Sequence, residues 1–228
     1  MAESAKDPLV IRRLDFIGGM AKAGTWRPEA MLPEVAFAGR SNVGKSSLLN
    51  KLVRRKAFAR VSKTPGRTRE INFFRVNDLF VLADLPGYGY AKVSKERKEE
   101  WRPLIEGYLS ESPALRGVVL LLDVRREPSH EDLQMLDFLA DLGPPTIIAA
   151  TKIDKLSRAA GPERVTALAR SLILDPEQII PFSAVTGAGR DELAAAVASL
   201  VEQPSWRVVP AEPLMSDEDG PTDALPPS

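Results

Sequence analysis

Cysteine is absent from the 228 residues, and histidine occurs once. Without cysteine, the chain has no disulfide framework, no zinc–thiolate site and no cysteine nucleophile. The single histidine, His130, lies beside a helix-start signal, and we interpret it as a surface residue rather than a catalytic base. Chemistry that depends on a thiol is thereby excluded.

Long hydrophobic runs are also missing. The longest apolar stretch, residues 118–122, is short and ends at Asp123, whereas a membrane-spanning helix needs about 18 apolar residues or more. The N-terminal sequence MAESAKDPLV lacks the apolar core of a signal peptide. We therefore expect a cytoplasmic protein without a membrane segment.

An excess of charge of either sign is missing from the chain as a whole, which has 31 basic and 31 acidic residues. A neutral total gives no global electrostatic argument for nucleic-acid binding and leaves local patches open. With 44% hydrophobic and 27% charged residues, the composition is typical of a globular protein. At roughly 150 residues per domain, the length allows one large or two small domains.

The two ends of the chain differ from its middle. Residues 203–228 contain six prolines, and five acidic residues oppose one arginine, which gives a net charge of −4. Few apolar side chains remain to offset the entropy of ordering, so we predict an acidic, proline-rich disordered tail. Residues 1–30 are predicted to form an N-terminal arm, with a short docked strand as the alternative. Residues 31–202 form the predicted main domain.

In the middle of the chain, short apolar runs alternate with segments of helical periodicity. This alternation predicts an α/β fold with a mostly parallel sheet covered by helices on both faces. Asn77-Asp78 suits a tight turn, so the two strands it joins are predicted to be antiparallel. Six strands are expected, at residues 33–38, 71–76, 79–83, 118–123, 146–150 and 178–182. Helices are expected at residues 48–53, 97–109, 129–139, 162–174 and 191–201.

A glycine-rich loop lies between the first of these strands and the first helix. Residues 39–46 read Gly-Arg-Ser-Asn-Val-Gly-Lys-Ser and match G-x-x-x-x-G-K-[ST]. The glycines let backbone N–H groups converge on phosphate oxygens, and the N-terminus of the following helix adds a positive field. Lys45 is predicted to reach the β- and γ-phosphates, and Ser46 to bind Mg²⁺. The strand–loop–helix context disfavours the alternative of a glycine-rich turn without a ligand.

Two further segments are predicted to sense the metal and the γ-phosphate. Residues 84–87 (Asp-Leu-Pro-Gly) follow a strand, where the carboxylate can hold Mg²⁺ through water and the Gly87 N–H can contact the γ-phosphate. In the basic stretch before the hairpin, Thr64 and Thr68 are candidates for the threonine that completes the Mg²⁺ shell, and we favour Thr68. A solvated basic loop is the alternative interpretation of that stretch.

A base-recognition site is predicted from two later motifs. Residues 151–154 (Thr-Lys-Ile-Asp) follow a strand, and the Asp154 carboxylate can accept hydrogen bonds from guanine N1–H and N2–H₂, which adenine lacks in that arrangement. Lys152 can lie across the base with its methylene stem. Residues 182–184 (Phe-Ser-Ala) end the last strand and can present backbone N–H groups to guanine O6. The order of these motifs behind the phosphate loop favours GTP over ATP.

These motifs resemble the five G boxes of the TRAFAC class of GTPases. The runs at residues 40–47, at 63–68 followed by Asn72-Phe-Phe, and at 84–91 (Asp-Leu-Pro-Gly-Tyr-Gly-Tyr-Ala) resemble the EngB family of bacterial GTPases in particular. The resemblance covers about residues 10–202. It departs from the usual GTPase pattern at Thr151, where asparagine is common, although a hydroxyl can still form local hydrogen bonds.

The resemblance implies a single Ras-like domain that binds GTP with Mg²⁺ and acts in assembly of the large (50S) ribosomal subunit, with a family link to septation and cell division. The alternative is a GTP-regulated interaction protein of cell division, in which hydrolysis is secondary. We expect a monomer whose metal ligands are Ser46, Thr68 and Asp84. The predicted GTP-binding residues are Gly39, Arg40, Ser41, Asn42, Val43, Gly44, Lys45, Ser46, Gly66, Arg67, Thr68, Arg69, Glu70, Asp84, Leu85, Pro86, Gly87, Thr151, Lys152, Ile153, Asp154, Phe182, Ser183 and Ala184.

The catalytic group predicted from these residues comprises Lys45, Asn42 and Thr68. Many Ras-like GTPases carry glutamine directly after D-x-x-G to orient the attacking water, but here that position is Tyr88. We therefore expect slow intrinsic hydrolysis, on the order of 10⁻⁴ s⁻¹. By resemblance, Asn42 is a candidate for holding a K⁺ ion that supplies positive charge. The alternative is an asparagine that caps the loop's own backbone.

A local basic segment lies within the neutral chain. Across residues 51–70, eight basic side chains oppose Glu70, which gives a net charge of +7, and further basic residues follow between 92 and 102. One interpretation is two solvated, flexible loops. The other is a surface that faces ribosomal RNA and changes shape with the γ-phosphate.

Overall fold

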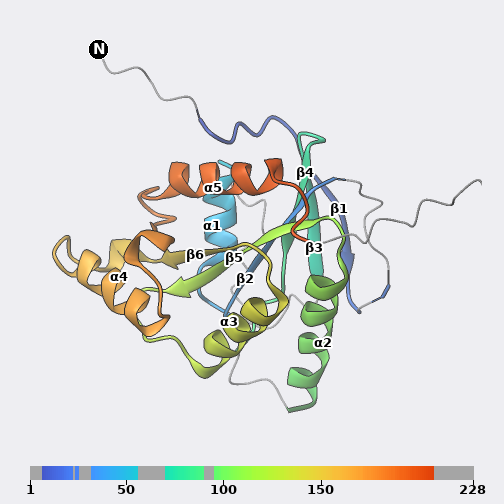
Figure 1. The fold of residues 1–228 in the computed structure, drawn as a ribbon. Coiled ribbons are helices and arrows are strands. Elements are labelled where there is room, and N and C mark those ends of the chain that lie inside the picture. The colour runs from blue at the N-terminus through green and yellow to red at the C-terminus, as the bar shows by residue number, and fades with distance from the viewer. Residues whose placement is uncertain (1–6, 23, 26–31, 56–69, 90–94, 208–228) are drawn as a thin grey trace, which may run out of the picture.

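A computed structural model of the chain describes residues 7–22, 24–25, 32–55, 70–89 and 95–207, the side chains of 95–101 excepted (Figure 1). The strands in this part are β1 (Leu14–Met20), β2 (Glu34–Gly39), β3 (Ile71–Val76), β4 (Phe80–Asp84), β5 (Leu115–Asp123), β6 (Thr146–Thr151) and β7 (Ile179–Phe182). The α-helices are α1 (Lys45–Leu52), α2 (Lys95–Glu111), α3 (His130–Leu142), α4 (Ala160–Ser171) and α5 (Arg190–Glu202). Short 3₁₀ turns lie at Ile153–Lys155 and Pro176–Gln178.

One sheet of seven strands runs through these residues in the order β1-β3-β4-β2-β5-β6-β7. The pairs from β4 to β7 are parallel, whereas β3 pairs antiparallel with both β4 and β1. The predicted fold class, a mostly parallel α/β sheet, is confirmed. The sheet has one strand more than the six predicted, because Leu14–Met20 adds an edge strand beside β3.

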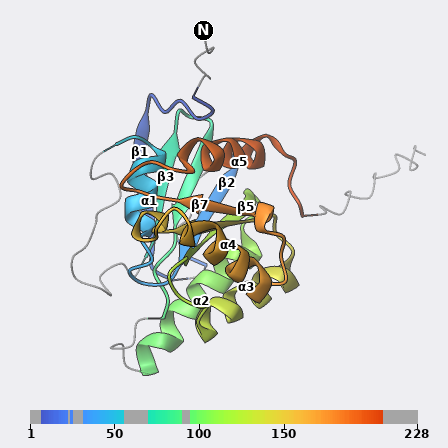
Figure 2. The same ribbon diagram turned by 90° about the vertical axis from the view of Figure 1, so that its left-hand side faces the viewer.

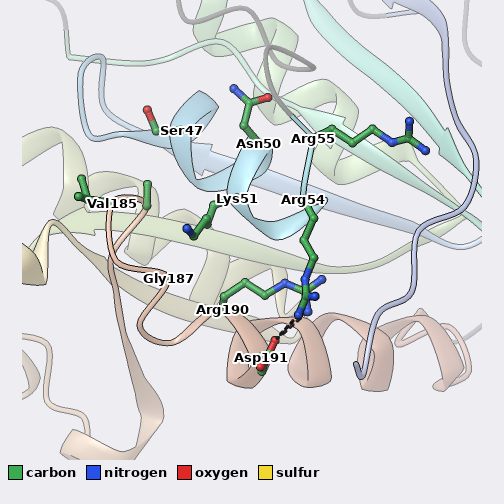
Figure 3. Close-up of a pocket in the computed structure, with 10 residues that line it drawn as sticks. Ser47, Asn50, Lys51, Arg54, Arg55, Val185, Gly187, Arg190 and Asp191 are labelled. Carbon is green, nitrogen blue, oxygen red and sulfur yellow. Dashed lines mark hydrogen bonds and ion pairs between the residues drawn. The ribbon is translucent and has the colours of Figure 1, made fainter. Parts of the chain in front are cut away.

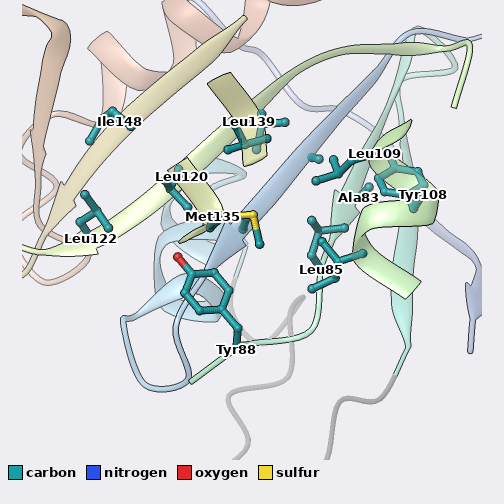
Figure 4. Close-up of a cluster of buried hydrophobic side chains, with 14 of the residues drawn as sticks. Ala83, Leu85, Tyr88, Tyr108, Leu109, Leu120, Leu122, Met135, Leu139 and Ile148 are labelled. Atoms are coloured by element: carbon teal, nitrogen blue, oxygen red, sulfur yellow. The ribbon is translucent and has the colours of Figure 1, made fainter. Parts of the chain in front are cut away.

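Helices cover both faces of the sheet (Figures 1 and 2). On one face, α1 and α5 pack on buried strand residues such as Phe37, Leu121 and Phe182. On the other face, α2, α3 and α4 pack on the alternate residues of the same strands, among them Leu120 and Ile148 (Figure 4). The central strands are apolar on both faces because both are covered, as is usual for parallel strands.

The β3–β4 hairpin turns at Asn77 and Asp78, which have positive φ angles of 52° and 56°. Two such residues in a two-residue link match the twist of the antiparallel strands, as predicted. The Asn77 side chain accepts hydrogen bonds from the backbone N–H groups of Arg12 and Arg13 at 2.8 and 3.0 Å, and donates to the Val10 carbonyl at 2.7 Å. These bonds hold the segment before β1 against the hairpin.

Arg190, at the first position of α5, links that N-terminal segment to α1. Its buried guanidinium donates to the carbonyl of Leu52 at 2.8 Å and to the carbonyl of Leu9 at 3.2 Å, and it forms an ion pair with Asp7. The Leu52 carbonyl at the end of α1 thus receives a donor that the helix cannot supply itself. Desolvation opposes ionisation of Asp7, but hydrogen bonds from Arg190 and the Leu9 N–H, with the nearby charge of Arg54 at 3.3 Å, outweigh it and lower the pKa of Asp7.

At the other end, the residues that follow α5 dock on α2. The Arg207 guanidinium donates to the carbonyls of Leu109 and Ser112 at 2.5 and 3.1 Å, and the Trp206 ring, 4.4 Å from the Arg207 guanidinium carbon, packs against the hydrophobic core. The predicted tail of residues 203–228 therefore begins with five residues that the structure places on the domain. Residues 208–228 lie outside the described ranges.

Candidate functional site

The phosphate loop leaves the sheet at the carboxyl end of β2. Gly39 ends the strand, and a Cβ atom there would meet Val43 Cγ1 at 2.9 Å, so the loop can curl this tightly only around glycine. Asn42 and Gly44 have positive φ angles of 67° and 107°, and α1 begins at Lys45. The predicted strand–loop–helix arrangement is therefore present, with the helix N-terminus at the end of the loop.

The segment after β4 lies against this loop. The Lys45 ammonium forms an ion pair with Asp84, the last residue of β4, and both side chains are 10% exposed. The Ser41 hydroxyl donates to the Gly87 carbonyl at 3.1 Å. A Cβ atom on Gly87 would lie 3.0–3.1 Å from Ser41, so the close approach of the two segments requires glycine.

Ser46 lies half-buried in the first turn of α1, directly after Lys45. Ser46 thus supplies a hydroxyl next to Lys45, and Asp84 supplies a carboxylate as the partner of that lysine. Mg²⁺ uses such oxygen ligands together with water and phosphate oxygens. Within the described ranges, no group of three His, Asp or Glu side chains gathers to hold a metal by itself. A cation at this place would draw its remaining ligands from a nucleotide and from water.

Tyr88 occupies the position where many GTPases have their water-orienting glutamine, and its ring lies in the core beside Met135 and Leu85 (Figure 4). The Tyr88 backbone also contacts the phosphate loop, because the Ser41 N–H donates to the Tyr88 carbonyl at 2.8 Å. Its hydroxyl donates to Asp132 at 3.0 Å, near the start of α3. Burial and the neighbouring Asp132 charge raise the pKa of Tyr88 well above its ordinary value. The phenol thus remains protonated and engaged with α3.

The first base motif contacts the phosphate loop through Thr151. Its buried hydroxyl lies 2.7 Å from the Val43 carbonyl and 3.1 Å from the Leu122 carbonyl. A hydroxyl has one proton to donate, and the shorter distance assigns its main bond to the phosphate loop. The local hydrogen bond expected of threonine at this position is present.

Lys152 has an unusual backbone conformation and an ammonium group with two hydrogen-bond partners. Its backbone has a positive φ angle of 65°, and its ammonium donates to the Asn42 carbonyl at 2.7 Å and to Asp123 at 2.9 Å. Burial opposes ionisation of Asp123, but hydrogen bonds from Arg125 and Lys152 outweigh it and hold the pKa of Asp123 far below its ordinary value. The methylene stem is thereby fixed between the loop and the end of β5.

The second base motif faces the first. The Ser183 hydroxyl donates to Asp154 at 2.8 Å and accepts the backbone N–H groups of Val185 and Thr186 at 3.2 and 3.0 Å. The Ser183 bond is the main reason that the pKa of Asp154 lies below its ordinary value. An ionised Asp154 is the form that accepts two donors from guanine.

The structure brings four predicted segments together at the carboxyl edge of the parallel strands: residues 39–46, 84–87, 151–154 and 182–184. Leu85, Pro86 and Phe182 are buried, and Ile153 packs against the core, so they support the segments that carry the polar groups. The Arg40 guanidinium donates to the Gly89 carbonyl at 3.3 Å. Gly66, Arg67, Thr68 and Arg69 lie outside the described residues, whereas Glu70 is exposed beside β3.

Two neighbours of the site were not predicted from the sequence. The first is Asp123, which anchors the Lys152 ammonium. Its position at the end of a strand next to the base motif was the available signal. The second is Asp132, which completes the Ser129 capping box at the start of α3 and accepts the hydrogen bond from the Tyr88 hydroxyl.

Fold and site together define a Ras-like P-loop GTPase. A family model described as "50S ribosome-binding GTPase" matches residues 34–152, more than half of the chain. The chain belongs to the EngB family of GTP-binding proteins. It is 66% identical over 204 residues to a protein of Gemmatimonas aurantiaca named "Probable GTP-binding protein EngB", and this match covers 90% of the chain and 100% of the relative.

Two further comparisons agree with this assignment. A protein of Geobacter sp. (strain M21) with the same name is 47% identical over 207 residues, covering 90% of the chain and 96% of the relative. The crystal structure of a probable GTP-binding protein EngB matches with a TM-score of 0.61 at 26% identity, covering 74% of this chain and 98% of that chain. No helix in the described part of the chain is long and apolar enough to span a membrane.

Proposed function

We propose that this GTPase acts as a cytoplasmic, monomeric switch in assembly of the large ribosomal subunit. The observation that carries the proposal is the matching family model, whose description names 50S ribosome binding. The excess of basic residues between 51 and 70 supports a partner with a phosphate backbone. Because the chain as a whole is neutral, a local basic segment agrees with RNA contact at one surface rather than with a general affinity for nucleic acid.

Depletion of the protein followed by ribosome profile analysis tests this proposal. We expect precursors of the 50S subunit to accumulate, and the purified protein to co-sediment with them in the GTP state and much less in the GDP state. Steep loss of binding with added salt is expected for a contact with RNA. Normal subunit profiles together with binding to a division protein would instead favour a regulatory role in septation, which is the alternative function.

Mg²⁺ is the proposed metal, bound by Ser46 and, through water, by Asp84, with Thr68 completing the shell in the GTP state. When bound, the metal neutralises charge on the β- and γ-phosphates. Lys45 binds the same phosphates, and the N-terminus of α1 orients them. We expect Ser46→Ala to weaken GTP binding more in Mg²⁺ than in EDTA, as measured by fluorescence titration. Equal losses in the two buffers would exclude Ser46 as a ligand.

Hydrolysis is proposed to be slow without a partner, because Tyr88 donates to Asp132 and lies in the core. Asn42 is exposed in the loop, and its backbone carbonyl receives Lys152, which leaves the side chain amide to bind K⁺. Hydrolysis should therefore be faster in KCl than in NaCl of equal ionic strength. Equal rates in the two salts, with and without ribosomal subunits, would exclude a role for K⁺.

A further inference from the structure

A basic groove lies beside the nucleotide-binding segments, between the C-terminal half of α1 and the loop that leads into α5 (Figure 3). Its volume is about 710 Å³. We define it by Ser47, Asn50, Lys51 and Arg54 on one wall and by Val185 and Gly187 on the other. The groove includes none of the phosphate-loop residues 39–46 and shares Ala184 with the second base motif.

The charge of this groove is strongly positive. Lys51, Arg54, Arg55 and Arg190 line it against the single carboxylate of Asp191, a net charge of +3. Arg190 is committed to buried carbonyl groups and to Asp7. The Arg55 guanidinium donates to the Arg12 carbonyl at 2.7 Å, so Lys51 and Arg54 are the cationic side chains of the groove that a ligand can reach.

Arg54 is held only weakly. Its side chain is 59% exposed and lies 3.3 Å from Asp7 and 3.5 Å from Asp191, which is itself 68% exposed (Figure 3). Exposed ion pairs contribute little to stability, so a phosphate can replace Asp191 as a partner of Arg54. Lys51 makes no ion pair with any residue that the structure describes.

The wall of the groove on the α1 side carries several groups that can bind phosphates. Ser47 and Lys51 lie one turn apart on α1, about 6 Å along the helix axis, and Arg54 follows the end of the helix with a positive φ of 52°. The opposite wall is backbone-rich: Gly187 has a φ of 89°, and a Cβ atom there would meet Lys51 Cε at 2.9 Å. In nucleic-acid complexes, phosphates and sugars are contacted by arginine, lysine, hydroxyl and amide groups and by helix N-termini.

We propose that this groove binds the phosphodiester backbone of an RNA segment. The inference rests on the proposed function and adds to it a docking surface on α1 and the β7–α5 loop. The groove also contacts Ala184, so the RNA lies next to the loop that receives guanine.

The test compares the double variant Lys51→Gln, Arg54→Gln with Arg170→Gln in the full-length protein. Arg170 is exposed on α4, on the opposite face of the sheet, and controls for loss of a positive charge. Binding of a short, unstructured single-stranded RNA is measured by fluorescence anisotropy across a salt series. We expect the double variant to bind less tightly and its salt slope to fall by about 1 for each side chain lost, with Arg170→Gln unchanged.

Three outcomes would overturn the inference. The first is wild-type RNA binding by the double variant, and the second is an equal affinity of the wild-type groove for polyglutamate, which would indicate an acidic protein partner. The third is weaker GDP binding by the double variant, because the groove would then belong to the nucleotide site. Lys51→Gln alone, which leaves the Arg54 ion pairs intact, repeats the test if the double variant misfolds.

Co-sedimentation with 50S precursors separates this inference from the proposed function. If the wild-type protein and the double variant bind the precursors equally, the groove is excluded while the role in subunit assembly stands. If the wild-type protein fails to bind them in either nucleotide state, the proposed function fails first. Selective loss of binding by the double variant supports both.

Discussion

The hydroxyl of Thr151 joins two loops that are more than a hundred residues apart in the sequence. It donates to the carbonyl of Val43 in the phosphate loop from the end of β6, and it is 3% exposed. A buried carbonyl left without a donor costs about 1–3 kcal/mol. This side chain therefore helps to fix the distance between the phosphate loop and the base motif, together with the bond from Lys152 to the Asn42 carbonyl.

Thr151→Val keeps the shape of the side chain and removes its proton. We expect the variant to unfold at lower urea concentration, with a loss of about 1–2 kcal/mol in the free energy of unfolding. It should also bind GDP and GTP more weakly by similar factors, because the two segments lose their fixed spacing. Thr151→Ser retains the hydroxyl and is the control. Wild-type nucleotide affinity in Thr151→Val would show that the bond does not position the loop.

Asp123 holds the Lys152 ammonium at 2.9 Å, and we expect it to affect nucleotide binding through that lysine. Asp123→Asn removes the charge that fixes the lysine ammonium, so we expect GDP and GTP to bind about tenfold more weakly, equivalent to about 1.4 kcal/mol. Isothermal titration calorimetry measures both affinities. Arg125→Gln removes the other partner of Asp123 and leaves the Lys152 contact, so it should bind nucleotide almost as the wild type does. Equal losses in the two variants would contradict the assigned role.

At the residue scale, the sequence predicted which motifs meet better than which side chains anchor them. The contact between Lys45 and Asp84 could be predicted because a carboxylate at the end of an apolar strand can face the phosphate loop. The anchor at Asp123 could not, because its contact with Lys152 depends on β5 and β6 being neighbours in the sheet. The same holds for Tyr88 and Asp132, which are 44 residues apart and meet only after α3 packs on the sheet.

Helix α4 ends before the helical pattern of apolar residues in its sequence does. The helix was predicted to reach Leu174 and ends at Ser171. The Leu174 N–H donates to the Ala169 carbonyl at 2.9 Å, which closes the helix around Ile173 in a left-handed conformation with φ 57°. Glycine normally marks such an end, and a β-branched residue there carries strain. Nothing in the structure explains the choice of isoleucine.

Ile173→Gly should therefore stabilise the protein. The side chain is 94% exposed, so its removal sacrifices little packing, and glycine relieves a left-handed conformation that costs about 1–2 kcal/mol. After allowance for the greater freedom of glycine in the unfolded chain, we expect a gain of about 1 kcal/mol in urea unfolding. Ile173→Val keeps the branched side chain and should leave stability unchanged. A loss of stability in Ile173→Gly would contradict the strain.

Among the strands, β1 is the element that the sequence left undecided. Its sequence LDFIGGM contains two glycines and a bulge between Phe16 and Gly18, so it lacks a clear alternation of apolar and polar residues. Its place is fixed by contacts from elsewhere, namely the Asn77 side chain in the hairpin turn and pairing with β3. Strands at a sheet edge depend on such neighbours more than on their own pattern.

Across the whole molecule, both ends of the described chain are tied to helices of the domain. The N-terminal segment contacts the end of α1 and the start of α5 through Arg190, on one face of the sheet. The C-terminal segment contacts the end of α2 through Arg207, on the other. In each case a guanidinium donates to carbonyl groups near the C-terminus of a helix, where the chain has acceptors without intrahelical donors.

Two truncations locate the C-terminal boundary of the stable unit. A chain that ends at Arg207 lacks residues 208–228 of the predicted tail but keeps the contacts of Trp206 and Arg207, and we expect its free energy of unfolding to equal that of the full chain. A chain that ends at Gln203 loses two hydrogen bonds at the end of α2 and the packing of the Trp206 ring, for a loss of about 2–3 kcal/mol.

Urea unfolding followed by circular dichroism compares the two truncated chains with the full chain, and Trp206→Ala in the full chain separates side-chain packing from loss of the tail. Because the contacts of Arg207 lie on the face opposite α1, neither truncation should change GDP affinity. Equal stability of all three chains would show that the docked segment contributes nothing. Destabilisation already at Arg207 would place part of the stable unit beyond that residue and would contradict the prediction of a disordered tail.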